Sequence, residues 1–398
     1  PDAEFLRRVA LDLTGIVPTS DDTRAFLNDD SSSKRQRLID QLLDSPEYAL
    51  HMARVMDVML TERRVATIRS YDVPTTNWRE YLAASFAGNK PWDQLVREIL
   101  SGDGTDAATG PAAKFYLSRD VKPELLTRDV GRLFLGVDLQ CAQCHDDPRY
   151  HDYKQADYFG IYAFVSRLSL FHDKEKKQTL LAEKAEGNVT FTSVFTGTKG
   201  ETNPRLPGGE MILDPDTEKD QQYKVAPASG VRSVPVYSRR QQLGRKLPRR
   251  ETNGFSINIV NRLWAHMLGR GLVEPLDLRH EKNPSSHPEL LKLLASRFEV
   301  MDFDIKALLR ELALTRTYQR ASLLPEGFST VPADRFAVAP LRALSPEQLA
   351  WSLLQTSGRL SVHLEAADQR LKADDPDHYD ALRHTWKWKK NVYDRFAR

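Results

Sequence analysis

The sequence predicts a mainly α-helical protein with two helical lobes and a small β-rich or irregular insertion between them. Over most of the chain, apolar residues recur at every third or fourth position, which is the spacing of an amphipathic helix. Near residue 189 this pattern changes to strand-like alternation, and glycine and proline are dense from residue 197 to residue 235. We therefore place a first lobe at residues 1–186, the insertion at 187–237 and a second lobe at 238–398.

Size and charge narrow the class of protein. A chain of 398 residues can form two lobes around a large core. The 57 basic residues nearly balance the 55 acidic ones, so no overall field attracts nucleic acid or an anionic membrane. No run of about 18 apolar residues occurs, and we expect no membrane span. Because the chain begins at Pro1 without an initiator methionine, we expect a mature or trimmed form.

The first lobe begins with a series of helices. Phe5, Val9 and Leu13 share one face of a helix that ends near Gly15. The same spacing predicts further helices around residues 21–27, 38–43, 78–86, 92–100 and 125–134.

A helix starting at Pro46 carries a stripe of methionines. Ser45 is a suitable N-cap, and proline is favoured at the first helical position. The stripe consists of Met52, Met56 and Met59, and methionines in this arrangement usually fill a core.

Residues 141–145 read Cys-Ala-Gln-Cys-His and contain both cysteines of the chain. This C-x-x-C-H spacing is typical of covalent c-type haem attachment. Each sulfur can add to one haem vinyl group, and the two intervening residues let both sulfurs face the same porphyrin edge. The imidazole of His145 then lies under the iron, where the axial ligand helps to set the reduction potential. The motif predicts one covalent haem c held by Cys141, Cys144 and His145.

Two other sites remain open for these cysteines. A redox dithiol is expected in a βαβ unit, whereas the residues before Cys141 predict a helix. A zinc site can be drawn from Cys141, Cys144, His145 and His151, but it crowds all four ligands into one short loop.

Three segments follow the motif before the second lobe. Tyr158, Tyr162 and Phe164 predict an aromatic helix that either covers a porphyrin face or packs in the core. Residues 189–196 alternate as a strand, and nothing in the insertion indicates catalysis. A basic cluster at residues 239–250 either docks an acidic redox partner or forms the solvated face of a helix.

The second lobe is predicted to be helical throughout. His266 lies on an otherwise apolar face with Ile259 and Leu263, in a helix closed by glycine. Capping boxes at Ser286 and Ser345 predict two helix starts, and a further helix covers residues 305–312.

Several of these segments carry a family likeness. Residues 5–19, 135–148, 261–273, 286–291 and 318–319 resemble the planctomycete-type cytochrome c-like family, in which a CxxCH haem domain is followed by a companion domain of unknown function. The resemblance implies a c-type haem, a location outside the cytoplasm and an association with polysaccharide-degrading enzymes. Relatives commonly have histidine where this chain has Asp147, so no ligand or proton-transfer role of that histidine carries over.

The motif leaves the second axial ligand undefined. His266 is the first candidate, because a histidine on an apolar helical face needs a polar partner, and iron is one such partner. The alternative is a core histidine bonded to the backbone. His287, His151, Met267 and the methionine stripe are further candidates.

These observations predict a periplasmic, or otherwise extracytoplasmic, c-type cytochrome that transfers single electrons to a partner protein. The alternative is a haem-dependent oxidoreductase with an open distal site, acting on a sugar, a peroxide or another small substrate. About 400 residues around one haem favour the enzyme, since a simple carrier needs far less chain. A third possibility is a haem-containing module of a polysaccharide-degrading system.

Overall fold

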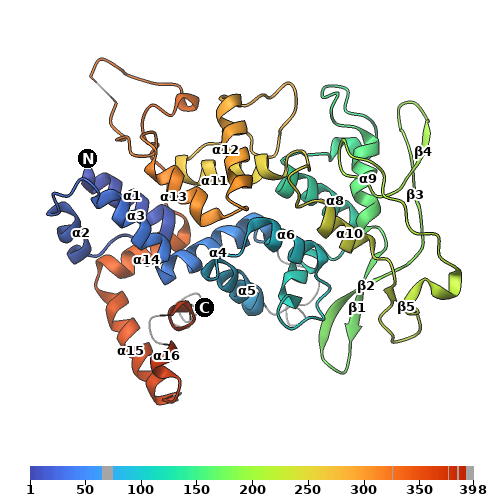
Figure 1. Cartoon of the computed structure of the whole chain (residues 1–398), viewed down its shortest axis with the longest axis horizontal. Coiled ribbons are helices and arrows are strands. Elements are labelled where there is room, and N and C mark those ends of the chain that lie inside the picture. The colour runs from blue at the N-terminus through green and yellow to red at the C-terminus, as the bar shows by residue number, and fades with distance from the viewer. Residues whose placement is uncertain (65–74, 325, 375, 383–384, 391–398) are drawn as a thin grey trace.

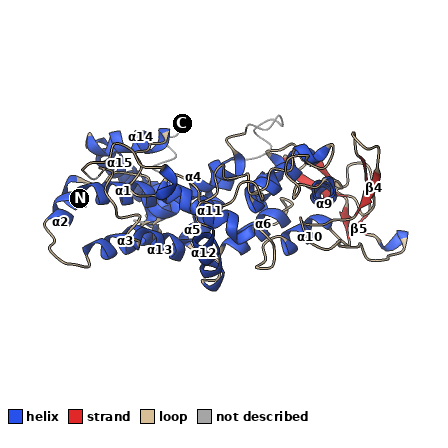
Figure 2. Ribbon diagram, turned by 90° about the horizontal axis from the view of Figure 1, so that it is seen from above, coloured by secondary structure: helices blue, strands red, loops and turns tan. Residues whose placement is uncertain are grey.

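The computed structural model describes residues 1–64, 75–324, 326–374, 376–382 and 385–390. In this part of the chain helices dominate, and the paired strands lie between residues 168 and 235 (Figure 1, Figure 2). The predicted class, mainly α with a small β-rich segment between helical regions, is confirmed. In Figure 1 the N-terminal helices lie at the left of the molecule and the strands at the right.

Local signals explain where the first helices begin and end. Gly15 closes the first helix with a left-handed φ of 74°, and a Cβ at this position would lie 2.4 Å from His51 Nδ1. Ser45 caps the fourth helix by accepting the Tyr48 N–H, as predicted. The helices are α1 (Asp2–Thr14), α2 (Ser20–Leu27), α3 (Lys34–Asp44), α4 (Pro46–Thr61), α5 (Thr75–Ala87), α6 (Trp92–Ser101), α7 (Lys114–Leu117), α8 (Pro123–Val130) and α9 (Gln155–Val165).

The strands form three antiparallel pairs: β1 (Leu168–Asp173) with β2 (Gln178–Glu183), β3 (Val189–Thr192) with β4 (Lys199–Thr202), and β5 (Tyr223–Val225) with β6 (Val234–Pro235). The first pair lies before residue 187, where the sequence predicted only the helical lobe. Every residue of β2 from Thr179 to Glu183 is buried, so this strand shows no alternation of apolar and polar residues.

The second helical region contains α10 (Arg239–Lys246), α11 (Phe255–Leu268), α12 (Pro288–Val300), α13 (Ile305–Leu314), α14 (Pro346–Thr356), α15 (Arg359–Asp374) and α16 (Tyr379–Leu382). The capping box at Ser345 is confirmed, with reciprocal bonds to Gln348. The prediction of a capping box at Ser286 was wrong. The helix α12 begins at Pro288, its N-cap residue is His287, and no side-chain hydrogen bond caps it.

The basic cluster matches the predicted solvated face only in part, because Arg245, Lys246, Arg249 and Arg250 are exposed whereas Arg239 and Arg240 are buried. Leu243 of α10 is buried as expected, but Arg239 is 0% exposed and Arg240 is 4% exposed. Arg239 pairs with Asp214 in the loop before β5, at 2.8 Å. These arginines therefore anchor the β-rich segment to α10 instead of facing solvent.

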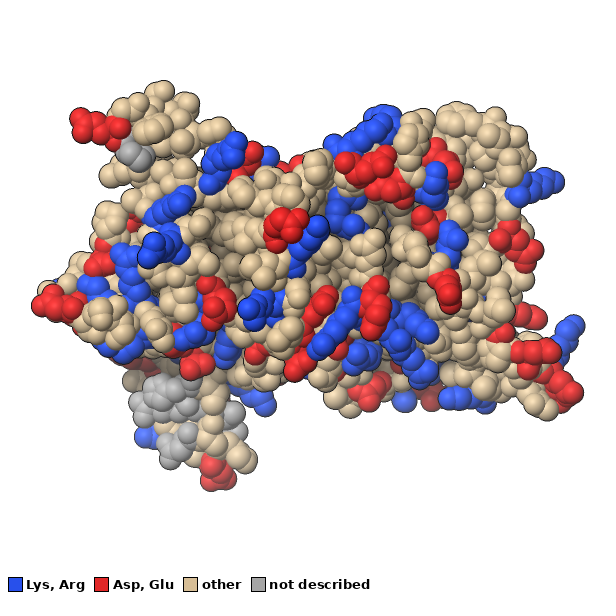
Figure 3. Space-filling model, turned by 45° about the horizontal axis from the view of Figure 1, so that its top comes forward, with Lys and Arg blue, Asp and Glu red and all other residues tan. Residues whose placement is uncertain are grey.

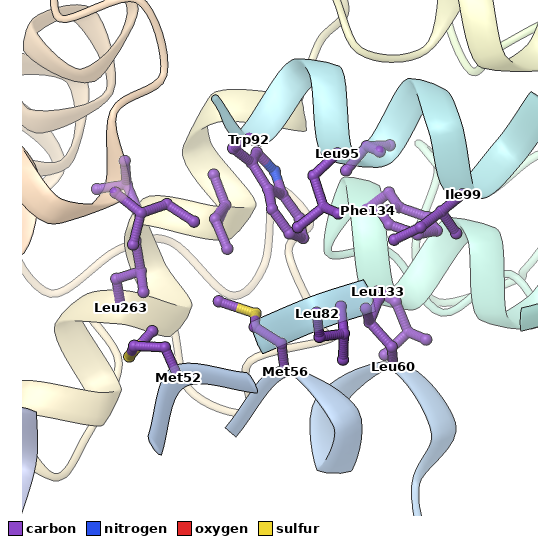
Figure 4. Close-up of a cluster of buried hydrophobic side chains, with 14 of the residues drawn as sticks. Met52, Met56, Leu60, Leu82, Trp92, Leu95, Ile99, Leu133, Phe134 and Leu263 are labelled. Carbon is purple, nitrogen blue, oxygen red and sulfur yellow. The ribbon is translucent and has the colours of Figure 1, made fainter. Parts of the chain in front are cut away.

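One hydrophobic core runs through both helical regions. Trp92 of α6 stacks on Phe255 of α11 with ring centroids 6.5 Å apart and packs on Phe134 at 6.3 Å. Figure 4 shows the methionine stripe within this core: Met52 and Met56 of α4 lie among the side chains of α6 and α11. The stripe is core filler, as the spacing indicated.

A buried ion pair joins three helices beside this core. Arg119 and Asp129 have fully buried side chains, and Arg119 Nε donates to Asp129 Oδ2 at 2.7 Å. Arg119 also donates to the carbonyls of Leu60 and Phe115, each at 2.8 Å. Burial alone raises the pKa of Asp129, but Arg119 and Arg128 outweigh it and hold the pKa below its usual value.

We expect Asp129→Ala to lower the free energy of unfolding by about 3–5 kcal/mol, because Arg119 is left buried without its charge partner. Urea denaturation followed by far-UV circular dichroism measures this loss. Asp21→Ala is the control, since it removes an exposed pair with Arg24 and should change stability by no more than about 0.5 kcal/mol. Equal effects of the two substitutions would contradict the prediction.

Candidate functional site

The C-x-x-C-H motif forms one short exposed turn directly after the core helices. Cys141–Gln143 is a single 3₁₀ turn, and the Cys144 N–H points to the Cys141 carbonyl at 3.4 Å. Ala142 is fully buried and anchors the turn, while both cysteine thiols are free and exposed. The turn therefore presents two unpaired thiols at the surface on a fixed base.

His145 is oriented by two contacts. Its Nδ1 lies 2.7 Å from the carbonyl oxygen of Asp146, so Nδ1 carries the proton and donates it. Its ring stacks on Phe195, with centroids 4.2 Å apart and an interplanar angle of 26°. Among the described residues Nε2 has no hydrogen-bond partner, so its lone pair is available to a ligand.

Asp147 has a structural role in the loop that follows the motif. Its side chain is buried and accepts the backbone N–H groups of Arg149 at 2.8 Å and Tyr150 at 3.2 Å. Its own N–H donates to the Tyr153 carbonyl at 2.9 Å. The carboxylate thus closes a turn and is occupied by backbone donors.

The β-rich segment contacts the motif, which the sequence did not indicate. The N–H of Val194 donates to the Cys144 carbonyl at 3.0 Å. The side-chain amide of Gln155 bridges the carbonyls of Gln143 at 3.3 Å and Thr192 at 3.4 Å. One backbone bond and the Gln155 side chain therefore connect the end of β3 and the following turn to the motif, and no sequence pattern predicts such long-range contacts.

The loop between α11 and α12 covers the other side of the motif loop. His280 stacks on Tyr150 with ring centroids 3.8 Å apart, and Tyr153 Oη donates to the Arg279 carbonyl at 3.1 Å. His280 Nδ1 accepts the Lys282 N–H, whereas Nε2 is buried without a partner among the described residues. No sequence pattern points to His280, because periodicity does not mark a histidine in a loop.

A cleft of about 430 Å³ lies beside the motif. Tyr162 and Glu124 both line this cleft, and burial raises the pKa of the Tyr162 hydroxyl. The predicted aromatic helix is thus α9, with Tyr158 in the core and Tyr162 at the cleft. The principal residues that line the cleft are Glu124, Gln143, Phe159, Tyr162, Lys184 and Asn188.

The zinc alternative finds no support in the geometry. Within the described part of the chain, no group of three or more histidine, cysteine, aspartate or glutamate side chains is placed to hold a metal ion. His151 is exposed on the loop after the motif and does not join Cys141, Cys144 and His145 in such a group.

The structure places His266 in a different environment from the motif. Its Nε2 bonds to the Asp12 carbonyl of α1 at 2.9 Å, and its ring lies 5.7 Å from that of His51 in α4. The carboxylate of Asp12 accepts the Tyr318 hydroxyl at 2.8 Å and a guanidinium N–H of Arg342. Since α1 and α9 lie at opposite sides of Figure 1, His266 and the motif are not brought together. The backbone-bonded alternative describes the observed contacts.

His287 and the buried methionines among the other ligand candidates also make their contacts elsewhere. His287 Nδ1 lies 3.1 Å from Ser286 Oγ, and its ring packs near Phe336. Met267, Met52 and Met56 are buried in the core. Histidines and methionines are placed by packing, so spacing along the sequence does not identify the second ligand.

The helical fold presents Cys141, Cys144 and His145 on one exposed turn, an arrangement compatible with a cytochrome-like protein. Residues 1–169 match PSCyt2, described as a protein of unknown function (DUF1549), and residues 239–398 match PSD1, described as a protein of unknown function (DUF1553). The chain belongs to the planctomycete cytochrome-like family that carries this domain pair. No curated protein and no solved structure matches it.

The buried histidine pair makes a pH-dependent contribution to stability. Loss of water lowers the pKa of His266 and, still more, that of His51, where the neighbouring His266 and Arg54 act in the same direction. The folded protein therefore keeps both rings neutral at a pH where the unfolded chain, with a usual histidine pKa of 6.5, binds protons. The stability that the two neutral rings contribute is fully present above about pH 6.5, and it is lost as the pH falls below that value.

We expect His266→Gln to weaken this pH dependence, because glutamine keeps a donor near the Asp12 carbonyl but does not titrate. Below about pH 6.5, the slope of the free energy of unfolding should decrease by up to about 1.4 kcal/mol per pH unit. Urea denaturation between about pH 7.5 and about pH 5.5 measures the slope. Burial raises the pKa of Asp12, which gives a contribution of the opposite sign in the wild type. Identical slopes for the wild type and His266→Gln would contradict the assignment of this pH dependence to His266.

Proposed function

We propose that this protein is an extracytoplasmic c-type cytochrome that carries one covalent haem and transfers single electrons to a partner protein. The observation that carries the proposal is the state of His145. Its Nδ1 proton is already bonded to a backbone carbonyl, and Nε2 is left without a partner among the described residues. Histidines that bind metals usually donate their second ring N–H in this way, which fixes the tautomer and raises the basicity of the ligating nitrogen.

The donor set fits a c-type haem. Cys141 and Cys144 are free, exposed and one turn apart, so each thiol is available to form a thioether bond. His145 follows directly and supplies the axial nitrogen. A bound haem provides one-electron iron chemistry at this position.

The surface around the motif suits a transient redox partner. Both thiols are exposed, so a group attached to them lies at the surface and within reach of a docked protein. Basic and acidic side chains are interspersed over the face drawn in Figure 3, which agrees with the small net charge of +2. No helix in the described ranges has the length and apolar character to cross a bilayer. Covalent haem attachment supports maturation in a periplasm-like compartment.

An open-site haem enzyme is the second candidate, and two observations favour it. His266, His287 and Met267 make their contacts away from the motif, so the described structure offers none of these as a second ligand. The cleft of about 430 Å³ beside Gln143 has room for a small substrate such as a sugar or a peroxide.

We expect the matured protein to bind one covalent haem per chain. A pyridine haemochrome assay on the denatured protein, with haem staining after electrophoresis, measures attachment. The double variant Cys141→Ala/Cys144→Ala should lose all covalent haem, because both thioether sulfurs are absent. Wild-type protein that carries no haem after maturation would remove the proposal, and the cysteines would return to a dithiol or metal role.

The absorption spectrum distinguishes the two candidates. A six-coordinate carrier should give a low-spin spectrum that cyanide and carbon monoxide leave unchanged. An open iron site should give a high-spin ferric spectrum that shifts when these ligands are added, and this result would favour the enzyme. Ferric protein is titrated with cyanide and ferrous protein with carbon monoxide, each with His266→Gln as a parallel sample. An unchanged His266→Gln spectrum would exclude His266 as an iron ligand.

A further inference from the structure

The β3–β4 hairpin is built to hold its tip against the motif. Its strands pair from Val189 opposite Thr202 to Thr192 opposite Lys199. The turn is closed by the Ser193 N–H to the Thr198 carbonyl and the Gly197 N–H to the Ser193 carbonyl, both at 2.9 Å. The tip therefore has a defined conformation, in which Val194 and Phe195 face outward from the hairpin.

Aromatic packing fixes the hairpin on α9. Phe191 stacks on Phe159 with ring centroids 4.7 Å apart and an interplanar angle of 3°. Gly200, opposite Phe191 in the ladder, makes room for that ring, since a Cβ there would lie 2.4 Å from it. The hairpin and α9 thus share one small apolar cluster, and α9 also carries Gln155, which bonds to the motif.

Phe195 is placed by the motif and not by the core. Its side chain is 71% exposed, and the one ring contact it makes among the described residues is with His145. The phenyl ring covers a face of the imidazole, whereas Nε2 lies on the edge of that ring. Stacking therefore leaves the ligating nitrogen accessible.

We propose that Phe195 is the positioning residue of the axial imidazole and that the insertion acts as a clamp on the haem site. This inference rests on the proposed function. The Asp146 carbonyl fixes the tautomer of His145, and Phe195 restricts rotation of its ring about the Cβ–Cγ bond. The Val194 N–H holds the hairpin tip to the Cys144 carbonyl, so the thiol-bearing turn and the imidazole are held by the same tip.

Two measurable properties depend on this contact. The orientation of the imidazole plane relative to the porphyrin determines the g values of the ferric iron and the paramagnetic shifts of the haem methyl groups. In the haem-loaded protein the phenyl ring would also shield one face of the imidazole from water, and water stabilises the more highly charged ferric state. Removal of the ring should therefore lower the reduction potential and spread the imidazole over several orientations.

The test compares holo-protein of the wild type, Phe195→Ala, Phe195→Tyr and Leu213→Ala. Leu213 is a matched control, because it is 69% exposed and lies in the same insertion but outside the β3–β4 hairpin. Electron paramagnetic resonance, proton NMR of the haem methyl groups and redox titration are the readouts. We expect a lower potential and broadened or multiplied signals for Phe195→Ala, near-wild-type behaviour for Phe195→Tyr, and no change for Leu213→Ala.

The outcomes separate this inference from the proposed function. Haem-loaded Phe195→Ala that matches Leu213→Ala in potential and spectra would overturn the positioning role and leave the cytochrome assignment standing. A Phe195→Tyr protein that behaves like Phe195→Ala would also overturn it, because a stacking role requires rescue by another aromatic ring. Absence of haemochrome in the wild type would overturn both.

A readout without haem tests the contact itself. In the Cys141→Ala/Cys144→Ala protein, the ring protons of His145 should resonate upfield, because they lie over the face of Phe195. Addition of Phe195→Ala should remove this ring-current shift. An equal position of the His145 resonances with and without Phe195 would overturn the proposal even where the haem-loaded variant cannot be prepared.

Discussion

The packing of Trp92 between Phe134 and Phe255 is the constraint on which the rest of the structure depends. It joins α6 to α11, and therefore the two family domains, in one core. Phe134 belongs to the last turn before the motif, and Leu139 and Ala142 continue the buried run into the motif. Aromatic rings in a close-packed interior tolerate little displacement, so the base of the exposed turn is fixed while its thiols remain free.

Three parts of the chain hold the motif, and each uses a different interaction. Within the first domain, Asp147 closes the following loop with backbone bonds. The hairpin of the insertion adds the Val194 bond and the Phe195 ring, and the companion domain adds the stack of His280 on Tyr150. The companion domain and the insertion are thus parts of the site.

His266 illustrates how a local pattern can place a residue without identifying what it contacts. The helical pattern correctly placed a histidine on a largely apolar face, where a polar partner is needed. The Asp12 carbonyl meets that need, within a network that includes Tyr318 and Arg342 and joins α1 to the second domain. Helix periodicity defines a face, but only the packing of distant helices decides what that face meets.

By itself, the sequence determined the mainly helical class, several helix starts such as those at Pro46 and Pro346, the core role of Met52 and Met56, and the presence of the C-x-x-C-H motif. These follow from local signals: residue spacing, capping side chains and donor types. The tertiary structure alone decided that Arg239 is buried against Asp214, that β2 is a strand, and that Phe195 and His280 lie on the motif loop. These contacts join residues far apart in the chain, and their energy depends on packing and desolvation that no local pattern encodes.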